Sequence, residues 1–223
     1  AHGEKLTLRI LDKSTLKLGL EKIGLSQENI SKFSKAILKP YGMILVTGPT
    51  GSGKTTTLYS AISTINNPDR QILTIEDPIE YRTHGINQIQ VRQEIGLTFA
   101  AGLRAILRAD PDIVMVGEIR DKETADISIK AALTGHLTLS SIHTNDATGT
   151  IIRLIDMGIE PFLISSSLII VIAQRLARKV CERCREPYGI PESFLIEFGL
   201  SSLAGEDHTF YHGKGCEACN NTG

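Results

Sequence analysis

The stretch that decides the fold of this chain reads Gly48-Pro49-Thr50-Gly51-Ser52-Gly53-Lys54-Thr55. It matches the pattern G-x-x-x-x-G-K-[ST], whose glycines let the backbone wrap so that its N–H groups point at phosphate oxygens. A chance glycine-rich turn is the alternative interpretation. The motif follows an apolar run at residues 43–46 and precedes a predicted helix at residues 55–65, which is the context that a phosphate-binding loop needs. We therefore predict a site for ATP or ADP with Mg²⁺.

The residues of this loop have separable expected roles. Lys54 is expected to reach the β- and γ-phosphates, and the Thr55 hydroxyl to bind Mg²⁺. The start of the following helix adds the positive end of its dipole. The remaining candidate nucleotide contacts in this stretch are Gly48, Pro49, Thr50, Gly51, Ser52, Gly53 and Thr56.

Strands and helices alternate on both sides of the loop. Continuous apolar runs predict further buried strands at residues 71–75, 113–116 and 136–142. We predict helices at residues 29–38, 98–108, 124–133, 148–157 and 161–179. Ser26, Asp121 and Asp146 are expected to cap the first, third and fourth of these helices, and Pro161 starts the last. This alternation predicts an α/β fold whose parallel sheet is covered by helices on both faces.

Acidic residues end two of the predicted strands. Glu118 follows four apolar residues, and ligands of open α/β sheets bind at the carboxyl ends of strands. It is our candidate to position the attacking water, and a solvated acid at a strand end is the alternative. The slot before it, which usually holds an Asp for the metal, is Gly117. Glu76 and Asp77, at the end of the 71–75 strand, are candidates for the missing carboxylate, although strand ends often carry solvated acids.

Histidines and arginines near these acids are candidate phosphate contacts. His136 and His143 bracket one strand at opposite ends, so we do not expect both to bind one metal. His143, at the carboxyl end, is the better γ-phosphate sensor; for His136, a nucleotide contact competes with a helix cap or another structural role. Arg104 and Arg108 share one helix face and Arg120 follows Glu118, and guanidinium groups stabilise transferring phosphates. A solvated or ion-paired helix face is the alternative for Arg104 and Arg108.

The four cysteines form two Cys-x-x-Cys pairs, Cys181 with Cys184 and Cys216 with Cys219. Two such pairs provide the four thiolates of a tetrahedral Zn²⁺ site, and four ligands leave no open position for catalysis. We therefore predict a structural zinc site in a small appendage. Disulfides and a redox-active pair are the alternatives, and a reducing compartment disfavours the disulfides.

Composition excludes several classes of protein. The 24 Lys and Arg residues nearly balance the 25 Asp and Glu residues, so a chain-wide basic field for nucleic acid or anionic lipid is not predicted. There is no Trp and aromatic content is 5%, which disfavours base-stacking platforms. The longest apolar stretch, residues 161–173, is shorter than the roughly 20 residues that span a bilayer, so we expect a buried helix there. We predict neither a nucleic-acid partner nor a membrane span.

Taken together, these motifs resemble the traffic ATPases that drive type II secretion and type IV pilus assembly. The resemblance covers residues 3–223 and includes the phosphate loop, the acidic box at residues 74–80, the segment at residues 110–121 with its Gly117, and the histidine box at residues 133–144. The four-cysteine appendage is similar to that of the secretion and pilus-assembly branches and is absent from the pilus-retraction branch. Residues 156–168 and 173–176 read closer to the secretion branch, which we favour, whereas residues 85–88 and 143–147 read closer to the pilus branch.

The resemblance implies a domain organisation. Residues 1–18 would be the remnant of a PAS-like second N-terminal domain and its linker, residues 19–180 a RecA-like P-loop ATPase domain, and residues 181–223 a truncated zinc-binding subdomain. Residues 5–11 read as a strand, in which Arg9 sits where the family projects an arginine finger into the nucleotide site. The chain opens with Ala1 and no Met, and it ends without a closing element, so we expect a fragment of a longer protein.

The resemblance also implies a mechanism and partners. ATP hydrolysis would take place between subunits of a homo-oligomeric ring, which we expect to be a hexamer, in the cytoplasm at the periphery of the bacterial inner membrane. The ring would act on a membrane platform protein and on cytoplasmic domains of the secretion or pilus machine. Two alternatives stay open at this point: an ATP-gated assembly scaffold with little turnover, and a nucleic-acid translocase on the same core.

Overall fold

A computed structural model describes residues 3–4, 6, 19–200 and 209–223 of the chain. The fold divides into two compact units, Ala1–Leu176 and Ala177–Gly223, and each is described by itself below. Arg9 lies outside the described residues, as does the predicted strand at residues 5–11 apart from Leu6. Among the described residues, no helix has the length and apolar character needed to cross a membrane.

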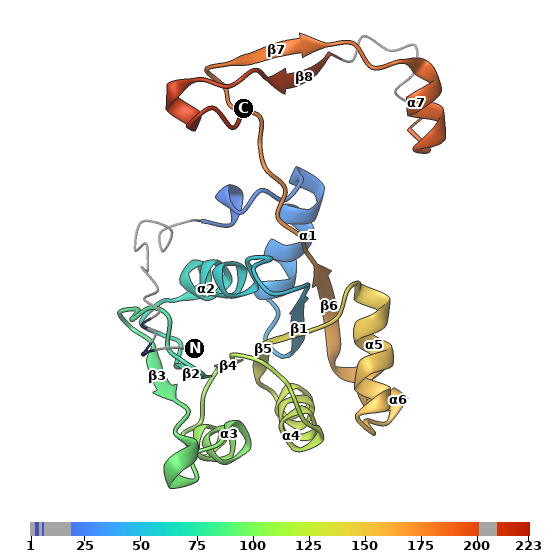
Figure 1. The fold of residues 1–223 in the computed structure, drawn as a ribbon. Coiled ribbons are helices and arrows are strands. Elements are labelled where there is room, and N and C mark those ends of the chain that lie inside the picture. The colour runs from blue at the N-terminus through green and yellow to red at the C-terminus, as the bar shows by residue number, and fades with distance from the viewer. Residues whose placement is uncertain (1–2, 5, 7–18, 201–208) are drawn as a thin grey trace. The chain divides into compact units, whose positions relative to one another are not determined.

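The first unit is built on a six-stranded sheet in the order β3-β2-β4-β5-β1-β6 (Figure 1). All neighbouring strands run parallel. The strands are β1 (Gly42–Thr47), β2 (Ile72–Glu76), β3 (Asn87–Gln90), β4 (Ile113–Val116), β5 (Leu137–Ile142) and β6 (Leu168–Ala173). Because all strands point the same way, the carboxyl ends of β1, β2, β4 and β5 meet at one edge of the sheet.

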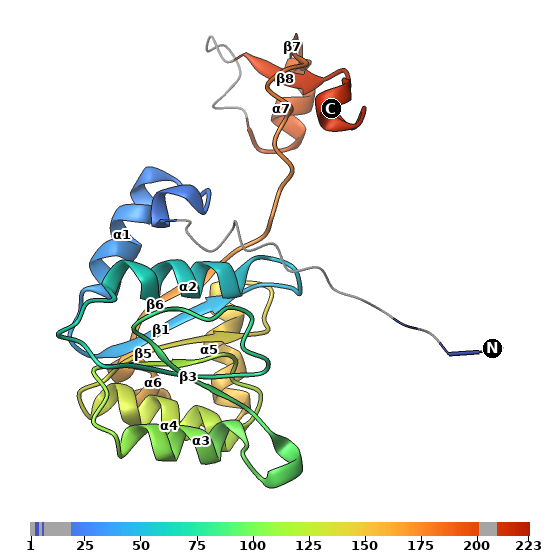
Figure 2. The ribbon, with the colours of Figure 1, turned by 90° about the vertical axis from the view of Figure 1, so that its left-hand side faces the viewer.

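Helices cover both faces of this sheet, with α1 and α2 on one side and α3 and α4 on the other (Figure 2). The α-helices are α1 (Gln27–Ile37), α2 (Lys54–Ile65), α3 (Phe99–Leu107), α4 (Lys122–Leu133), α5 (Ala147–Asp156) and α6 (Pro161–Ser167). The described residues of this unit also form two single-turn 3₁₀ helices, η2 (Leu20–Lys22) and η3 (Gln93–Ile95). The parallel α/β arrangement predicted from the sequence is therefore confirmed.

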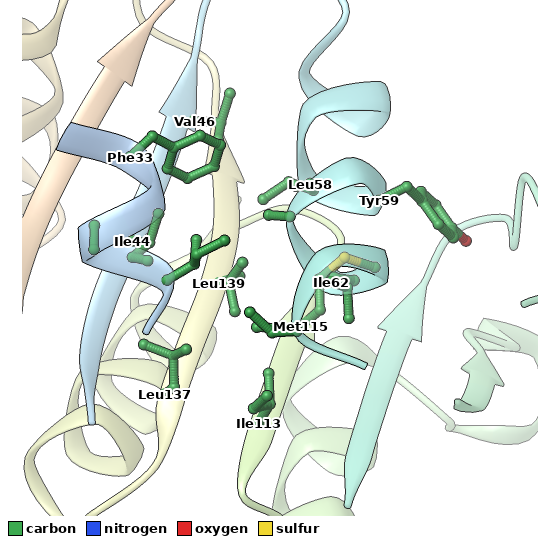
Figure 3. Packing of buried hydrophobic residues seen from close by; sticks show 14 of the residues in the cluster. Phe33, Ile44, Val46, Leu58, Tyr59, Ile62, Ile113, Met115, Leu137 and Leu139 are labelled. Carbon is green, nitrogen blue, oxygen red and sulfur yellow. The ribbon is translucent and has the colours of Figure 1, made fainter. Parts of the chain in front are cut away.

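Successive residues of the central strands pack in different hydrophobic cores, on opposite faces of the sheet. In β1, Ile44 and Val46 pack with Phe33 of α1 and Leu58 of α2 (Figure 3). Met43 and the other residues that alternate with them pack against α4, α5 and α6 instead. All six residues of β1 are buried, as expected for a strand covered on both faces. This two-sided burial fixes the register of β1, and with it the position of the loop that follows.

The predicted helix caps are confirmed. The Ser26 side chain accepts a hydrogen bond from Asn29 N at 3.3 Å, and Asp121 accepts one from Thr124 N at 2.8 Å. Asp146 caps α5 in the same way. Each side chain satisfies a backbone N–H that has no partner inside its helix.

The prediction of one helix over residues 161–179 is wrong. The helix α6 ends at Ser167, and Leu168–Ala173 forms the edge strand β6 beside β1. The Ser166 and Ser167 hydroxyls bond back to the carbonyls of Phe162 and Leu163 near the helix end. The run that follows is rich in β-branched residues, which favour strands, and β1 offers it an open edge for pairing.

The described residues of the second unit contain few helices and strands. These are the strands β7 (Arg185–Tyr188) and β8 (Phe210–Gly213), the helix α7 (Glu192–Glu197) and the 3₁₀ turn η5 (Glu217–Cys219). The two strands pair antiparallel. Among the described residues of this unit, only Cys184 and Leu195 are buried. A hairpin with so small an apolar core needs a further source of stability.

Candidate functional site

The phosphate loop joins β1 to α2 in the first unit. Gly48 has φ of +143°, and a Cβ there would lie 2.3 Å from Gln174 O, so only glycine fits. Gly53 caps α2 with φ of +86°, in the left-handed region. Lys54 Nζ donates to the carbonyls of Gly48 and Pro49, at 2.9 and 3.1 Å. Burial lowers the pKa of Lys54, and the nearby charge of Glu118 partly offsets this effect.

Gln174, just after β6, holds this loop in place. It belongs to the segment at residues 173–176 that resembles the secretion branch, but its contact with the loop was not predicted. Its Nε2 donates to Ser52 O at 2.7 Å, and its Oε1 accepts from the Thr57 hydroxyl at 2.9 Å. Its backbone N donates to Thr47 O at 2.9 Å. The side chain of Gln174 therefore ties the loop to the first turn of α2, and its backbone N–H ties the residue after β6 to the end of β1.

A cavity of about 460 Å³ opens over the loop. It is lined by Thr50, Gly51, Ser52, Gly53, Lys54, Thr55, Thr56, Leu58, Glu76, Asp77, Pro78, Glu80, Phe99, Met115, Gly117, Glu118, Ser141, His143 and Leu176. The buried Ser52 Oγ has no hydrogen-bond partner within the described part of the chain. A buried hydroxyl without a partner, in a loop of this sequence pattern, fits a site shaped around an anion.

Glu118 and His143 line this cavity beside Lys54. His143 Nδ1 lies 3.5 Å from Lys54 Nζ, and His143 Nε2 lies 3.3 Å from Glu118 Oε2. Glu118 also pairs with the guanidinium of Arg120. The structure thus brings four predicted site residues into one chain of contacts that begins at the phosphate loop.

Glu76 occupies a more enclosed position at the end of β2. Its carboxylate accepts hydrogen bonds from the hydroxyls of Tyr59 and Thr74 and from Gln88 Nε2, the last at 3.0 Å. Burial and the neighbouring Glu76 raise the pKa of Tyr59, so that Tyr59 stays protonated and remains a donor. A Cβ at Gly117 would lie 3.4 Å from Glu76 Cα. Glu76 therefore lies beside the slot where the sequence carries Gly117.

Hydroxyl groups hold the loops that carry Glu118 and His143. Ser141 Oγ donates to Gly117 O at 2.8 Å, which fixes the end of β4. Thr47, Thr144 and Thr150 form a row of hydroxyls in which each neighbouring pair of oxygens is 2.6 Å apart. This row joins the last residue of β1 to the residue after His143 and to the first turns of α5. Ser141 and Thr144 fall within the histidine box at residues 133–144, whereas no sequence motif points to Thr47 or Thr150.

Several predicted site residues lie elsewhere. His136, at the amino end of β5, has its Nδ1 3.0 Å from Ala131 O and does not line the cavity. Arg104 pairs with Glu123 at 2.5 Å on an exposed surface. Arg108 is exposed at the end of α3. Within this chain, Arg104 and Arg108 do not contact the phosphate loop.

The four cysteines come together in the second unit. Their sulfur atoms all lie within 4.8 Å of one another, with Cys181–Cys216 and Cys184–Cys219 at 3.9 Å and Cys216–Cys219 at 3.7 Å. A disulfide needs about 2.05 Å, whereas tetrahedral Zn–S bonds of about 2.3 Å place sulfurs about 3.8 Å apart. Backbone N–H donation, first from Cys216, lowers the pKa of Cys219 to about 6. The geometry fits four-thiolate zinc.

A glycine-rich loop between a strand and a helix, with the acidic ends of β2 and β4 around its cavity, defines a P-loop nucleotide-binding protein. Residues 1–223 match the family described as "Type II/IV secretion system protein". The chain belongs to this family.

Curated relatives carry two kinds of name. The "Type IV pilus assembly ATPase PilB" of Myxococcus xanthus (strain DK1622) is 55% identical over 222 residues, 99% of this chain and 39% of that protein. The "Type II secretion system protein E" of Dickeya dadantii (strain 3937) is also 55% identical over 222 residues, 100% of this chain and 44% of that protein. The chain therefore spans about two fifths of the length of these relatives.

Solved structures agree with the family assignment. The pilus retraction motor PilT with bound ADP matches with a TM-score of 0.63 and 36% identity, over 87% of this chain and 52% of that one. The VirB11 ATPase of the Brucella suis type IV secretion system, in complex with sulphate, matches with a TM-score of 0.57 and 26% identity. This match covers 74% of this chain and 51% of that one. These matches confirm the predicted fold class.

Proposed function

We propose that this chain is the ATP-hydrolysing part of a motor that powers type II secretion or type IV pilus assembly. The observation that carries the proposal is the placement of Glu118 and His143 opposite Lys54 on one cavity. A phosphate loop alone binds nucleotide, whereas an acid and a histidine at its far side supply groups for turnover.

Each residue has a role in the proposed reaction. Loop N–H groups and Lys54 hold the phosphates, and Glu118 orients the attacking water and accepts its proton. His143 contacts the γ-phosphate and positions Glu118. The Thr55 hydroxyl, with Glu76 and Asp77 at the facing strand end, would hold Mg²⁺, which neutralises developing charge on the phosphates.

The arginines divide into two groups. Arg120 contacts Glu118 and acts within the same chain. Arg104 and Arg108 are exposed away from the cavity, so a contribution from them requires a neighbouring subunit. Such sharing suits a ring, and we propose a homo-oligomer, a hexamer in the simplest case, with Arg9 as a further arginine supplied near the site.

The proposed setting follows the named relatives. The motor would work in the cytoplasm against the inner membrane, on a platform protein and the cytoplasmic domains of its machine. Names of both kinds occur at 55% identity, so the relatives support type II secretion and type IV pilus assembly equally. The secretion branch remains our choice on the sequence of residues 156–168. In the second unit, we propose one structural Zn²⁺ per chain.

The test is phosphate release from MgATP by the full-length protein and its Glu118→Gln variant. We expect the variant to bind ATP with parental affinity and to lose turnover by about 10²- to 10⁴-fold, since it keeps the shape of the side chain without its basicity. Glu94→Gln, which removes an exposed carboxylate from η3 outside the cavity, is the matched control and should keep the parental rate.

Other outcomes assign other functions. Tight ATP binding with hardly any phosphate release by the parent protein would indicate a nucleotide-gated scaffold. Phosphate release that rises strongly on addition of DNA would indicate a nucleic-acid translocase. A Glu118→Gln variant that turns over near the parental rate would remove Glu118 from its catalytic role.

A further inference from the structure

Leu176 lies at the mouth of the phosphate-loop cavity. Its side chain is 71% exposed, yet it is one of the residues that line the phosphate-loop cavity. Single exposed leucines are common on protein surfaces and need no explanation. An exposed aliphatic side chain at the mouth of a nucleotide cavity, however, is available to a ligand that enters there.

The backbone that carries Leu176 is fastened to the phosphate loop. Gln174, two residues earlier, donates to Thr47 O and Ser52 O and accepts from the Thr57 hydroxyl. A Cβ built on Gly53 would lie 3.2 Å from Gln174 Nε2 and 3.7 Å from Leu176 Cδ2. Leu176 is therefore held against the start of α2 by its neighbours in sequence.

This position lies at a defined end of the cavity. Lys54 Nζ, which serves the β- and γ-phosphates, is directed toward His143, and His143 contacts Glu118. That side is the γ-phosphate end. Leu176 approaches the loop at Gly53, where the backbone N–H groups at the helix start cradle the α- and β-phosphates. The nucleoside extends from the α-phosphate, away from the γ-phosphate end.

We propose that Leu176 forms the nucleoside side of this site, where it contacts the flat face of a purine base, and that Gln174 positions the phosphate loop beside it. The proposal rests on the nucleotide-binding function proposed above. An aliphatic side chain contacts the face of a base and not its hydrogen-bonding edge, so it should favour the binding of adenine and guanine nucleotides equally.

The experiment separates the base from the phosphates by calorimetric titration of the purified full-length protein with MgADP. Affinity for inorganic tripolyphosphate with Mg²⁺ is measured by its displacement of bound MgADP. For Leu176→Ala we expect the Kd of MgADP to rise about 5-fold, and that of MgGDP likewise. The expected rise in Kd is smaller than the rise caused by truncating a side chain in an enclosed hydrophobic pocket, because Leu176 is open to solvent. The Kd of tripolyphosphate should stay within about 2-fold of the parental value.

Three variants complete the design. Leu176→Met keeps an apolar side chain and should retain the parental Kd of MgADP. Leu38→Ala removes a leucine that is 63% exposed at the end of α1, outside the cavity, and should change neither affinity. Gln174→Ala should weaken MgADP and tripolyphosphate together, because it loosens the loop that both ligands use.

The possible failures are distinguishable. A parental protein that binds neither MgADP nor tripolyphosphate contradicts the proposed function itself. A parental protein that binds both, with a Leu176→Ala variant of unchanged MgADP affinity, overturns the inference alone. Equal weakening of both ligands by Leu176→Ala also overturns it, because the leucine would then act on the loop and not on the base.

Discussion

The two units of this chain are stabilised in different ways. The first buries large side chains such as Phe33, Ile44 and Leu103 almost completely on both faces of its sheet. The second buries only Cys184 and Leu195 among its described residues, while leaving Phe194 and Phe198 largely exposed. Apolar burial therefore accounts for the first unit, whereas we expect the second to depend on a metal ion held by its four thiolates. A break in either source of stability should leave the other unit folded.

Metal removal should have the largest effect, and only on the second unit. Structural zinc contributes on the order of 10–16 kcal/mol to small domains of this kind. We expect chelation, or Cys184→Ser, to abolish amide protection in Arg185–Tyr188 and Phe210–Gly213 while the melting of the first unit stays unchanged. Hydrogen exchange and elemental analysis measure this, with about one zinc per chain in the parent. Protected hairpin amides in metal-free protein would contradict it.

Truncation of a buried apolar side chain should have the opposite effect: it should destabilise the first unit strongly, whereas truncation of an apolar side chain in the second unit should cost little. Leu139→Ala removes a fully buried side chain beneath α2 and should cost about 2–5 kcal/mol of unfolding free energy. Phe198→Ala, at a side chain 61% exposed in the second unit, should cost less than about 0.5 kcal/mol. Urea titrations followed separately for each unit give both values. Equal losses of unfolding free energy in the two variants would contradict the view that apolar burial stabilises the first unit more than the second.

A smaller cost is expected where the first unit buries a charge. Tyr59→Phe keeps the ring that packs edge-on against Tyr81, 5.6 Å away between centroids, but removes the hydroxyl that donates to Glu76. An incompletely satisfied buried carboxylate should cost about 1–3 kcal/mol. The Mg²⁺ concentration required for half-maximal phosphate release should also rise, because Glu76 lines the cavity. A change in stability without any change in Mg²⁺ requirement would limit Tyr59 to a structural role.

The smallest effect concerns the charge of Lys54. Burial lowers the pKa of Lys54, and the negative charge of Glu118 offsets part of this lowering. Glu118→Gln removes the raising charge, so Lys54 should lose its proton at a lower pH than in the parent. Affinity for MgADP should therefore begin to fall at a lower pH in this variant as pH increases from about 7 to about 10. Superimposable profiles of Kd against pH would show that Glu118 does not act on Lys54.

Much of the first unit follows from local sequence. The prediction of a strand at residues 113–116 matches β4, because a buried parallel strand reads as a short apolar run. The phosphate loop was predictable because glycines and a lysine at this spacing, between a strand and a helix, rarely occur by chance. The strand β6 was not, since an apolar run fits a helix equally well, and only pairing with β1 decides between them.

The residues that support the site could not be predicted, for a different reason. Gln174 lies 117 positions from its partner Thr57, and one glutamine after an apolar run carries no pattern of its own. The polar strand β3, which brings Gln88 to Glu76, also lacks the alternation that predicts strands. Acid and histidine positions could be predicted because they follow strands, whereas the groups that hold them depend on tertiary contacts.

The row of hydroxyls formed by Thr47, Thr144 and Thr150 constrains how this site can change in evolution. Each hydroxyl has one proton to donate, so the directions of neighbouring hydrogen bonds depend on one another. Replacement of a single member by valine removes one of the hydrogen-bond partners of the next oxygen, while joint replacement of neighbours removes the need for that partner. In descendants of this sequence, substitutions at these three positions should accumulate together, even though 97 positions separate the first from the second.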